Sequence, residues 1–154
     1  MMNWNVADIE QYINEQEYID TVVIPLVPIT FGQGMKNNAS QMEFINILTQ
    51  QLERQFKGRL LLLPNFTYVE EVDKLTNKEM LQTFVSHLKA LPLKHVLYVT
   101  SDKVWKSYEN ELEGECIWIP AIPLDNMDDQ YKRSIMEDQV KQLLNIFIQK
   151  WQNR

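Results

Sequence analysis

Cysteine, histidine and glycine are scarce in this chain of 154 residues, which has one cysteine, two histidines and four glycines. A single cysteine excludes an internal disulfide, and Cys116 lies in an apolar run, which indicates a buried and unreactive thiol. No apolar run approaches the roughly 18 residues that a membrane span requires. The first residues include Asp8 and Glu10 and no basic stretch, so we expect no signal peptide. These absences favour a soluble cytoplasmic protein with no membrane partner.

Basic residues are also outnumbered, with 15 lysines and arginines against 21 aspartates and glutamates. An acidic chain repels the phosphate backbone of a nucleic acid unless its basic residues are concentrated on one surface. The nearest such pair, Lys132 and Arg133, lies in a segment that also contains Asp128, Asp129 and Glu137. We therefore expect no nucleic-acid partner.

The sequence has no complete motif for a cofactor or a metal ion. Gly32-Gln33-Gly34 resembles a fragment of a phosphate-binding loop, but it lacks the third glycine of the dinucleotide fingerprint and the Gly-Lys-Ser/Thr ending of a Walker loop. His87 and His95 have no cysteine, histidine or carboxylate at metal-ligand spacing. We expect a flexible turn at the glycines, structural or surface roles for the histidines, and neither cofactor nor metal.

What the sequence does contain is a strand followed by a helix, four times over. The short apolar runs that predict strands are residues 21–27, 60–64, 95–100 and 116–119. The first run does not alternate between apolar and polar residues, which is typical of a strand covered on both faces. Pro25 and Pro28 predict that its hydrogen bonding stops near its end. Residues 65–74 are expected to be irregular.

The stretches between these runs have apolar residues at helical spacing. Asn5 is expected to cap a helix over residues 6–17, and a second helix is expected over residues 40–57. Thr76 and Glu79 form a capping box that predicts the start of a third helix, and Ser101 is expected to cap a short fourth. A last helix is predicted over residues 128–151.

This alternation predicts one α/β domain over residues 1–154, built as three layers (α/β/α) around a four-stranded, mostly parallel sheet. Right-handed crossovers favour the strand order 2-1-3-4, which is a flavodoxin-like or Rossmann-like order. Such a sheet binds ligands in the crevice at the carboxyl ends of its strands, between the first and third strands.

Polar side chains that follow the predicted strands are therefore the candidate binding residues. A hydroxyl, amide or charged group in this crevice can hydrogen-bond a small polar ligand, and the helix end at Ser101 offers main-chain amides to an anion. The alternative is that all of them are ordinary turn and cap residues. The candidates are Gln33, Lys36, Asn65, Ser101, Asp102 and Asp125.

The last helix has a heptad-like apolar stretch, which favours either of two packing arrangements. Met136, Val140, Leu143 and Phe147 can form the seam of a homodimer, or they can pack on the protein's own sheet. Packing on the sheet is the default, and the homodimer stays open as an alternative.

Three segments of the chain resemble a known family. They are residues 4–12 (WNVADIEQY), residues 17–26 (EYIDTVVIPL) and residues 58–64 (GRLLLLP). Together they are similar to the YpiF-like proteins, an uncharacterised family of Bacillus-type Gram-positive bacteria. The resemblance covers nearly the whole chain. It implies a bacterial cytoplasmic protein, and it supplies no activity and no site residues.

For function, the absence of a nucleophile–base or metal constellation favours a non-catalytic binding or regulatory module, with a small polar ligand or a protein as its partner. The alternative is a small enzyme that acts on a polar metabolite in the strand-end crevice, with Lys36, Asn65 or Asp102 taking part.

Overall fold

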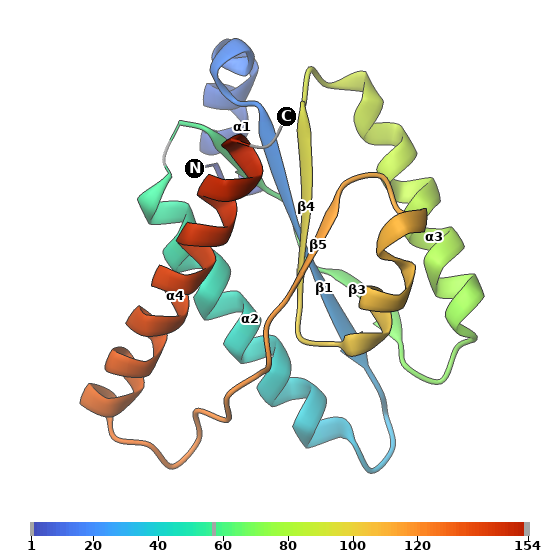
Figure 1. Ribbon diagram of the computed structural model, residues 1–154, viewed down its shortest axis with the longest axis vertical. Coiled ribbons are helices and arrows are strands. Elements are labelled where there is room, and N and C mark those ends of the chain that lie inside the picture. The colour runs from blue at the N-terminus through green and yellow to red at the C-terminus, as the bar shows by residue number, and fades with distance from the viewer. Residues whose placement is uncertain (1, 57, 153–154) are drawn as a thin grey trace.

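A parallel β-sheet forms the centre of the computed structural model, which describes residues 2–56 and 58–152 (Figure 1). The strands follow the order β2-β1-β4-β5, and β3 pairs with the carboxyl half of β1 beyond the end of β2. All of these pairs are parallel, as predicted, and the order of the four predicted strands is confirmed. The strands are β1 (Thr21–Ile29), β2 (Leu60–Leu62), β3 (Phe66–Val69), β4 (His95–Thr100) and β5 (Glu115–Trp118).

Strand β3 corrects the prediction of an irregular segment after residue 65. The run from Phe66 to Val69 is rich in aromatic and β-branched residues, which favour strands. It pairs with Leu26 to Ile29 of β1, a stretch that β2 does not reach. Pairing with β1 therefore makes this short run a strand, although the residues around it are polar.

The two prolines of β1 do not end the strand, because both face gaps in the sheet. Alternate residues of a parallel strand direct their main-chain groups to opposite neighbours. Leu63 donates to the carbonyl of Val23 (3.0 Å), so Pro25 faces the same side, where β2 has ended and β3 has not yet begun. Pro28 lies beyond Leu26, the last residue that pairs with β4. Neither missing N–H therefore costs a ladder hydrogen bond.

Helices cover both faces of the sheet, so the predicted three-layer architecture is confirmed (Figure 1). Helices α2 (Met35–Gln55) and α4 (Asp129–Gln152) pack on one face. The other face is covered by α1 (Val6–Asn14), α3 (Lys74–Ser86) and the 3₁₀ helix η3 (Lys103–Glu111). Short 3₁₀ turns occur at η1 (Gln16–Tyr18) and η2 (His87–Ala90). No helix in residues 2–56 and 58–152 has the length and apolar character needed to cross a membrane.

The core is divided between the two faces, as a strand buried on both sides requires. Val23 and Val27 of β1 belong to the apolar cluster under α2 and α4, and Val22 and Ile24 belong to the cluster on the other face. The heptad-like residues of α4 are buried in the first cluster, so within one chain they pack on the sheet. They are Met136, Val140, Leu143 and Phe147.

Several helix starts differ from the prediction. Helix α2 begins five residues earlier than expected, and its predicted end at Lys57 lies outside the described residues. Helix α3 begins at Lys74, so Thr76 lies inside it and no capping box forms. The cap of η3 is Asp102 rather than Ser101, because the Asp102 carboxylate accepts from the Val104 amide (3.1 Å). Asn5 caps α1 as predicted.

Candidate binding site

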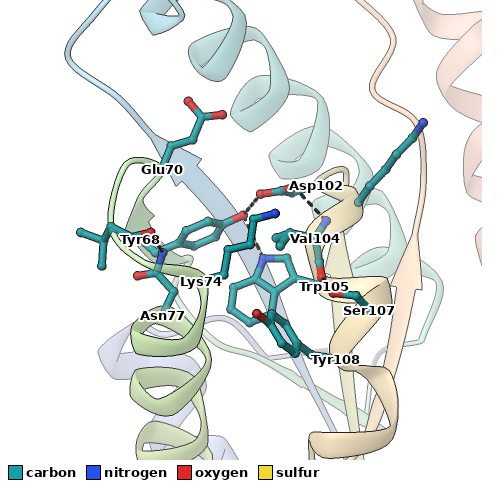
Figure 2. A pocket seen from close by; sticks show the side chains of 11 residues that line it. Tyr68, Glu70, Lys74, Asn77, Asp102, Val104, Trp105, Ser107 and Tyr108 are labelled. Carbon is teal, nitrogen blue, oxygen red and sulfur yellow. Dashed lines mark hydrogen bonds between the residues drawn. The ribbon is translucent and has the colours of Figure 1, made fainter.

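A hollow of about 450 Å³ opens at the carboxyl ends of β3 and β4, on the face covered by α3 and η3 (Figure 2). We call it the strand-end hollow. Its wall combines the end of β3, the β3–α3 turn, the first turn of α3 and most of η3. The lining residues are Tyr68, Glu70, Val72, Lys74, Asn77, Asp102, Lys103, Val104, Trp105, Ser107 and Tyr108.

A chain of three side chains forms the inner wall of the strand-end hollow. The Trp105 indole Nε1 donates to the Tyr68 hydroxyl (2.9 Å), which donates in turn to Asp102 Oδ2 (2.5 Å). The Tyr68 and Trp105 rings meet edge to face, with centroids 5.2 Å apart. Both rings are buried, and Figure 2 shows the hydrogen bonds between them and Asp102. These contacts join β3, η3 and the end of β4 into one rigid wall.

Burial raises the pKa of Tyr68 far above that of an ordinary phenol, and its hydrogen bond to Asp102 adds to the shift. The phenol therefore keeps its proton at physiological pH and donates it to Asp102. Asp102 also accepts from the Val104 amide, and its own amide donates to Thr100 Oγ1 (3.0 Å). The carboxylate thus occupies the amino end of η3, where the sequence suggested that an anionic ligand would bind.

Charged side chains of both signs surround the mouth of the strand-end hollow. Lys74 and Glu70 are exposed and come from the two ends of the β3–α3 turn (Figure 2). Lys103 lies at the start of η3, with its ammonium 5.6 Å from the Trp118 ring. Asn77 fixes the turn, because its amide donates to the carbonyls of Val69 (3.2 Å) and Val72 (3.4 Å). The mouth therefore offers donors and acceptors on a fixed backbone.

The structure places Asp102 alone of the predicted residues in the wall of this hollow. Ser101 is its neighbour, but the Ser101 carbonyl accepts from the Trp118 indole (3.0 Å), and the Ser101 hydroxyl is buried with no hydrogen bond to the described residues. Asn65 lines a different hollow, at the end of β2.

The other three predicted residues are exposed on separate connections. Gln33 lies in the loop after β1, and Lys36 lies in the first turn of α2. Asp125 lies in the loop after β5. None of these three lines the strand-end hollow. The six candidates are therefore not assembled into one site.

Sequence reasoning missed Tyr68 and Lys74 because the segment that holds them was expected to be irregular. The signal was the aromatic and β-branched run from Phe66 to Val69, which is typical of a strand. Trp105 faces the protein interior, and its indole N–H needs an acceptor, which the sequence did not identify.

The chemistry that the hollow supports is hydrogen bonding and ion pairing. Among the described residues, no cluster of three or more His, Cys, Asp or Glu side chains is arranged to hold a metal ion. The Ser107 hydroxyl donates to the Val104 carbonyl (2.6 Å), so it stabilises η3. Lys74 and the edge of Tyr108 remain available to a molecule in the hollow, whereas Glu70 Oε2 already accepts from the Asn38 side-chain amide (3.5 Å).

Comparison with known proteins places the chain in a family. Residues 10–151 match the family model described as "Protein of unknown function (DUF2487)". The chain is also 35% identical over 152 residues to the uncharacterized protein YpiF of Bacillus subtilis (strain 168), an alignment that covers 97% of this chain and 98% of that protein. No solved structure is significantly similar to it. By both its family match and its similarity to YpiF, the chain belongs to the DUF2487 family.

Proposed function

We propose that this protein is a non-catalytic binding module that holds a small polar ligand in the strand-end hollow. The observation that carries the proposal is the rigid wall of Tyr68, Asp102 and Trp105 beneath a mouth with charged side chains. A parallel sheet binds ligands outside the carboxyl ends of its strands, where the connections turn to opposite sides. The hollow lies beside this place, at the carboxyl ends of β3 and β4, and the two connections that line it both lead to the face covered by α3 and η3.

The charges around the hollow favour a ligand with both donor and acceptor groups. Lys74 and Lys103 contribute positive charge, and Glu70 and Asp102 contribute negative charge. Strongly anionic ligands such as nucleoside triphosphates are disfavoured, because the two carboxylates offset the attraction of the two lysines and leave no net positive charge. A zwitterionic metabolite, such as an amino acid, fits this balance of charges better.

The hydroxyl groups of the hollow support binding rather than catalysis. Catalysis by Tyr68 as a base would require ionisation of a phenol whose pKa burial has raised. Serine catalysis would require a free hydroxyl with a neighbouring base, but the Ser107 hydroxyl already donates to the main chain. Burial also raises the pKa of the Cys116 thiol to about 12, so it is protonated at neutral pH.

The proposal places the module in the cytoplasm. This location is supported by the single, protonated cysteine, which suits a reducing compartment. A homodimer through α4 would have to use the exposed side chains of that helix, such as Ile148 (42% exposed), because its heptad-like residues are buried in the core.

A thermal-shift screen with millimolar amino acids, dicarboxylic acids and sugar phosphates tests the proposal. A bound ligand stabilises the fold by about 2.7 kcal/mol at a hundredfold excess over its dissociation constant. We expect an amino acid to raise the melting temperature of the wild type, and Lys74→Ala to reduce that shift. Lys36→Ala is the matched control, because Lys36 is an exposed lysine outside the hollow.

The proposal fails if no compound stabilises the wild type, or if Lys74→Ala and Lys36→Ala respond alike. Turnover of the stabilising compound by the purified protein would contradict the non-catalytic part and favour the small enzyme instead.

A further inference from the structure

A second hollow, of about 490 Å³, lies at the carboxyl end of β2 and shares no lining residue with the strand-end hollow. It is bounded by the segment before α1, by the middle of α2 and by the β2–β3 turn. It exists because β2 ends at Leu62 and β3 begins only at Phe66, so that Pro25 of β1 faces a gap in the sheet. We call it the amide-lined hollow.

The wall of the amide-lined hollow is rich in carboxamides and contains no ionisable side chain. Charged residues make up 23% of the chain, yet none of them lines this hollow. Its carboxamides come from three separate segments and converge on one space. They are Asn3, Asn5, Asn46, Gln50 and Asn65.

Three of these carboxamides already have partners, and two do not. The Asn3 side-chain oxygen accepts from Gln50 Nε2 (3.2 Å), and Asn5 caps α1 through the Asp8 amide (2.8 Å). Asn46 and Asn65 are half-buried, and their side chains make no hydrogen bond to the described residues. Each carboxamide offers two donors and two acceptor lone pairs, so these two can bind a ligand from two sides.

Apolar residues line the same hollow. Pro25, Leu63 and Pro64 are among them, and the Trp4 side chain, which also lines the hollow, is 61% exposed. A large exposed ring beside unpartnered carboxamides suits a ligand with an apolar face and a polar edge. A sugar ring has both, because its C–H groups pack on an aromatic ring while its hydroxyls donate and accept hydrogen bonds.

We propose that the amide-lined hollow binds a neutral sugar. A charged ligand would lose its hydration without gaining a counter-charge, which disfavours it. A nucleobase is also flat and polar at its edge, but its recognition relies on stacking against aromatic side chains, and among the described residues Trp4 is the one aromatic residue that lines this hollow. The inference does not depend on the function proposed for the strand-end hollow.

Nuclear magnetic resonance titration with glucose and N-acetylglucosamine tests the inference. We expect saturable shifts of the Trp4 indole N–H signal and of the Asn65 carboxamide signals at millimolar sugar. Asn65→Ala should weaken the affinity about fivefold, which corresponds to the loss of a hydrogen bond. Asn46→Asp keeps the size of the side chain and should also weaken binding, because it removes two donors. Asn37→Ala, an exposed asparagine of α2 outside the hollow, should leave the affinity unchanged.

Glucuronate and uridine are the competing probes. The inference is overturned if neither neutral sugar shifts these signals, if glucuronate or uridine binds as tightly as the sugars, or if Asn65→Ala and Asn46→Asp both bind sugar like the wild type. Melting curves of the variants confirm that each is folded, so a lost shift reports on the site.

Discussion

The helices on the two faces of the sheet are held by different kinds of side-chain contact. Under α2 and α4 the contact is largely apolar, with the Phe56 and Phe147 rings stacked 6.3 Å apart and the Trp151 ring edge-on to Phe56 at 4.7 Å. The Trp151 indole also donates to the buried Thr21 hydroxyl on this face (2.7 Å). Under α3 and η3 the contact includes a chain of two hydrogen bonds, a buried one from Trp105 to Tyr68 and a partly buried one from Tyr68 to Asp102. The first face is a scaffold, and the second carries the strand-end hollow.

This difference shows where the fold fixes geometry as well as stability. Apolar packing is adaptable, because many arrangements of similar volume bury the same surface. A buried hydrogen bond is directional, and breaking it leaves a donor or acceptor without a partner. The polar face therefore fixes the positions of Tyr68 and Asp102, which is what a binding site requires.

The largest effect is expected from breaking the apolar face. Phe147 is fully buried against Phe56 and Trp151, so Phe147→Ala should lower the free energy of unfolding by roughly 3–5 kcal/mol. Urea denaturation measures this loss. Phe31→Ala is the matched control and should cost little, because Phe31 is 73% exposed. Equal losses in the two variants would contradict the assignment of Phe147 to the core.

The turns that lead from helix to strand on the two faces give the next comparison. Gly58 (φ 89°) precedes β2 and Gly114 (φ 107°) precedes β5, so both adopt a left-handed conformation. A Cβ at Gly114 would lie 2.4 Å from the Val96 carbonyl oxygen, whereas a Cβ at Gly58 would meet nothing within 4 Å.

Gly114→Ala should therefore cost roughly 2–4 kcal/mol, because a backbone clash adds to the conformational strain. Gly58→Ala should cost only about 1 kcal/mol, from the strain alone. Thermal or urea unfolding of both variants measures the difference. If Gly58→Ala is as unstable as Gly114→Ala, the close packing of β5 on β4 is not the cause of the stability lost in Gly114→Ala.

Removing one oxygen atom sharpens the account of the polar face. Tyr68→Phe leaves the Trp105 indole without its acceptor and Asp102 Oδ2 without the Tyr68 donor, while Asp102 Oδ1 keeps the Val104 amide, so it should cost about 1–3 kcal/mol. Tyr131→Phe, at a tyrosine that is 58% exposed, should cost almost nothing. If the two substitutions have the same effect on the free energy of unfolding, the hydrogen-bonded wall does not stabilise the fold.

The smallest effect concerns an ion pair that joins the start of β1 to the scaffold face. Arg59 binds Asp20 (3.1 Å) and stacks on the Trp151 ring, 3.8 Å from its centroid. Burial raises the pKa of Asp20, but the hydrogen bonds from Arg59 and Thr21 and the charges of Arg59 and His95 outweigh it, so its net pKa is lowered.

A lowered pKa means that the folded protein holds the Asp20 proton less tightly than the unfolded chain does. The stabilisation is therefore present above the ordinary carboxyl pKa of about 3.9 and is lost as the pH falls through the lower folded value. Asp20→Asn should lose less stability than the wild type between about pH 5 and pH 3. If the stability of both proteins depends on acid pH in the same way, the ionised Asp20 carboxylate does not stabilise the fold.

Much of the fold follows from the sequence alone, because burial on both faces leaves a clear pattern. The apolar run from residue 21 and the stripe of α4 through Phe147 predicted their elements correctly. Strand β3 was missed because it is short and half-exposed, and because its pairing depends on where β2 ends.

The candidate site was predicted less completely, because its residues are far apart in the sequence. Tyr68 and Asp102 are 34 residues apart, and only the sheet brings them together. Asp102, which lines the hollow, was a candidate because it lies two residues after the end of a predicted strand. Gln33 and Lys36 also follow a strand, but their side chains are exposed outside the hollow. The position of a residue after a strand does not by itself determine whether its side chain lines the hollow.

The central claim is that the strand-end hollow binds the ligand. It is tested most directly by titrating the protein with the most stabilising amino acid and mapping the shifts of the main-chain amide signals. The account predicts shifts that cluster at residues 68–77 and 102–108, around the strand-end hollow, and that leave residues 129–152 of α4 unchanged. Shifts confined to α2 and α4, or spread evenly over the chain, would contradict it.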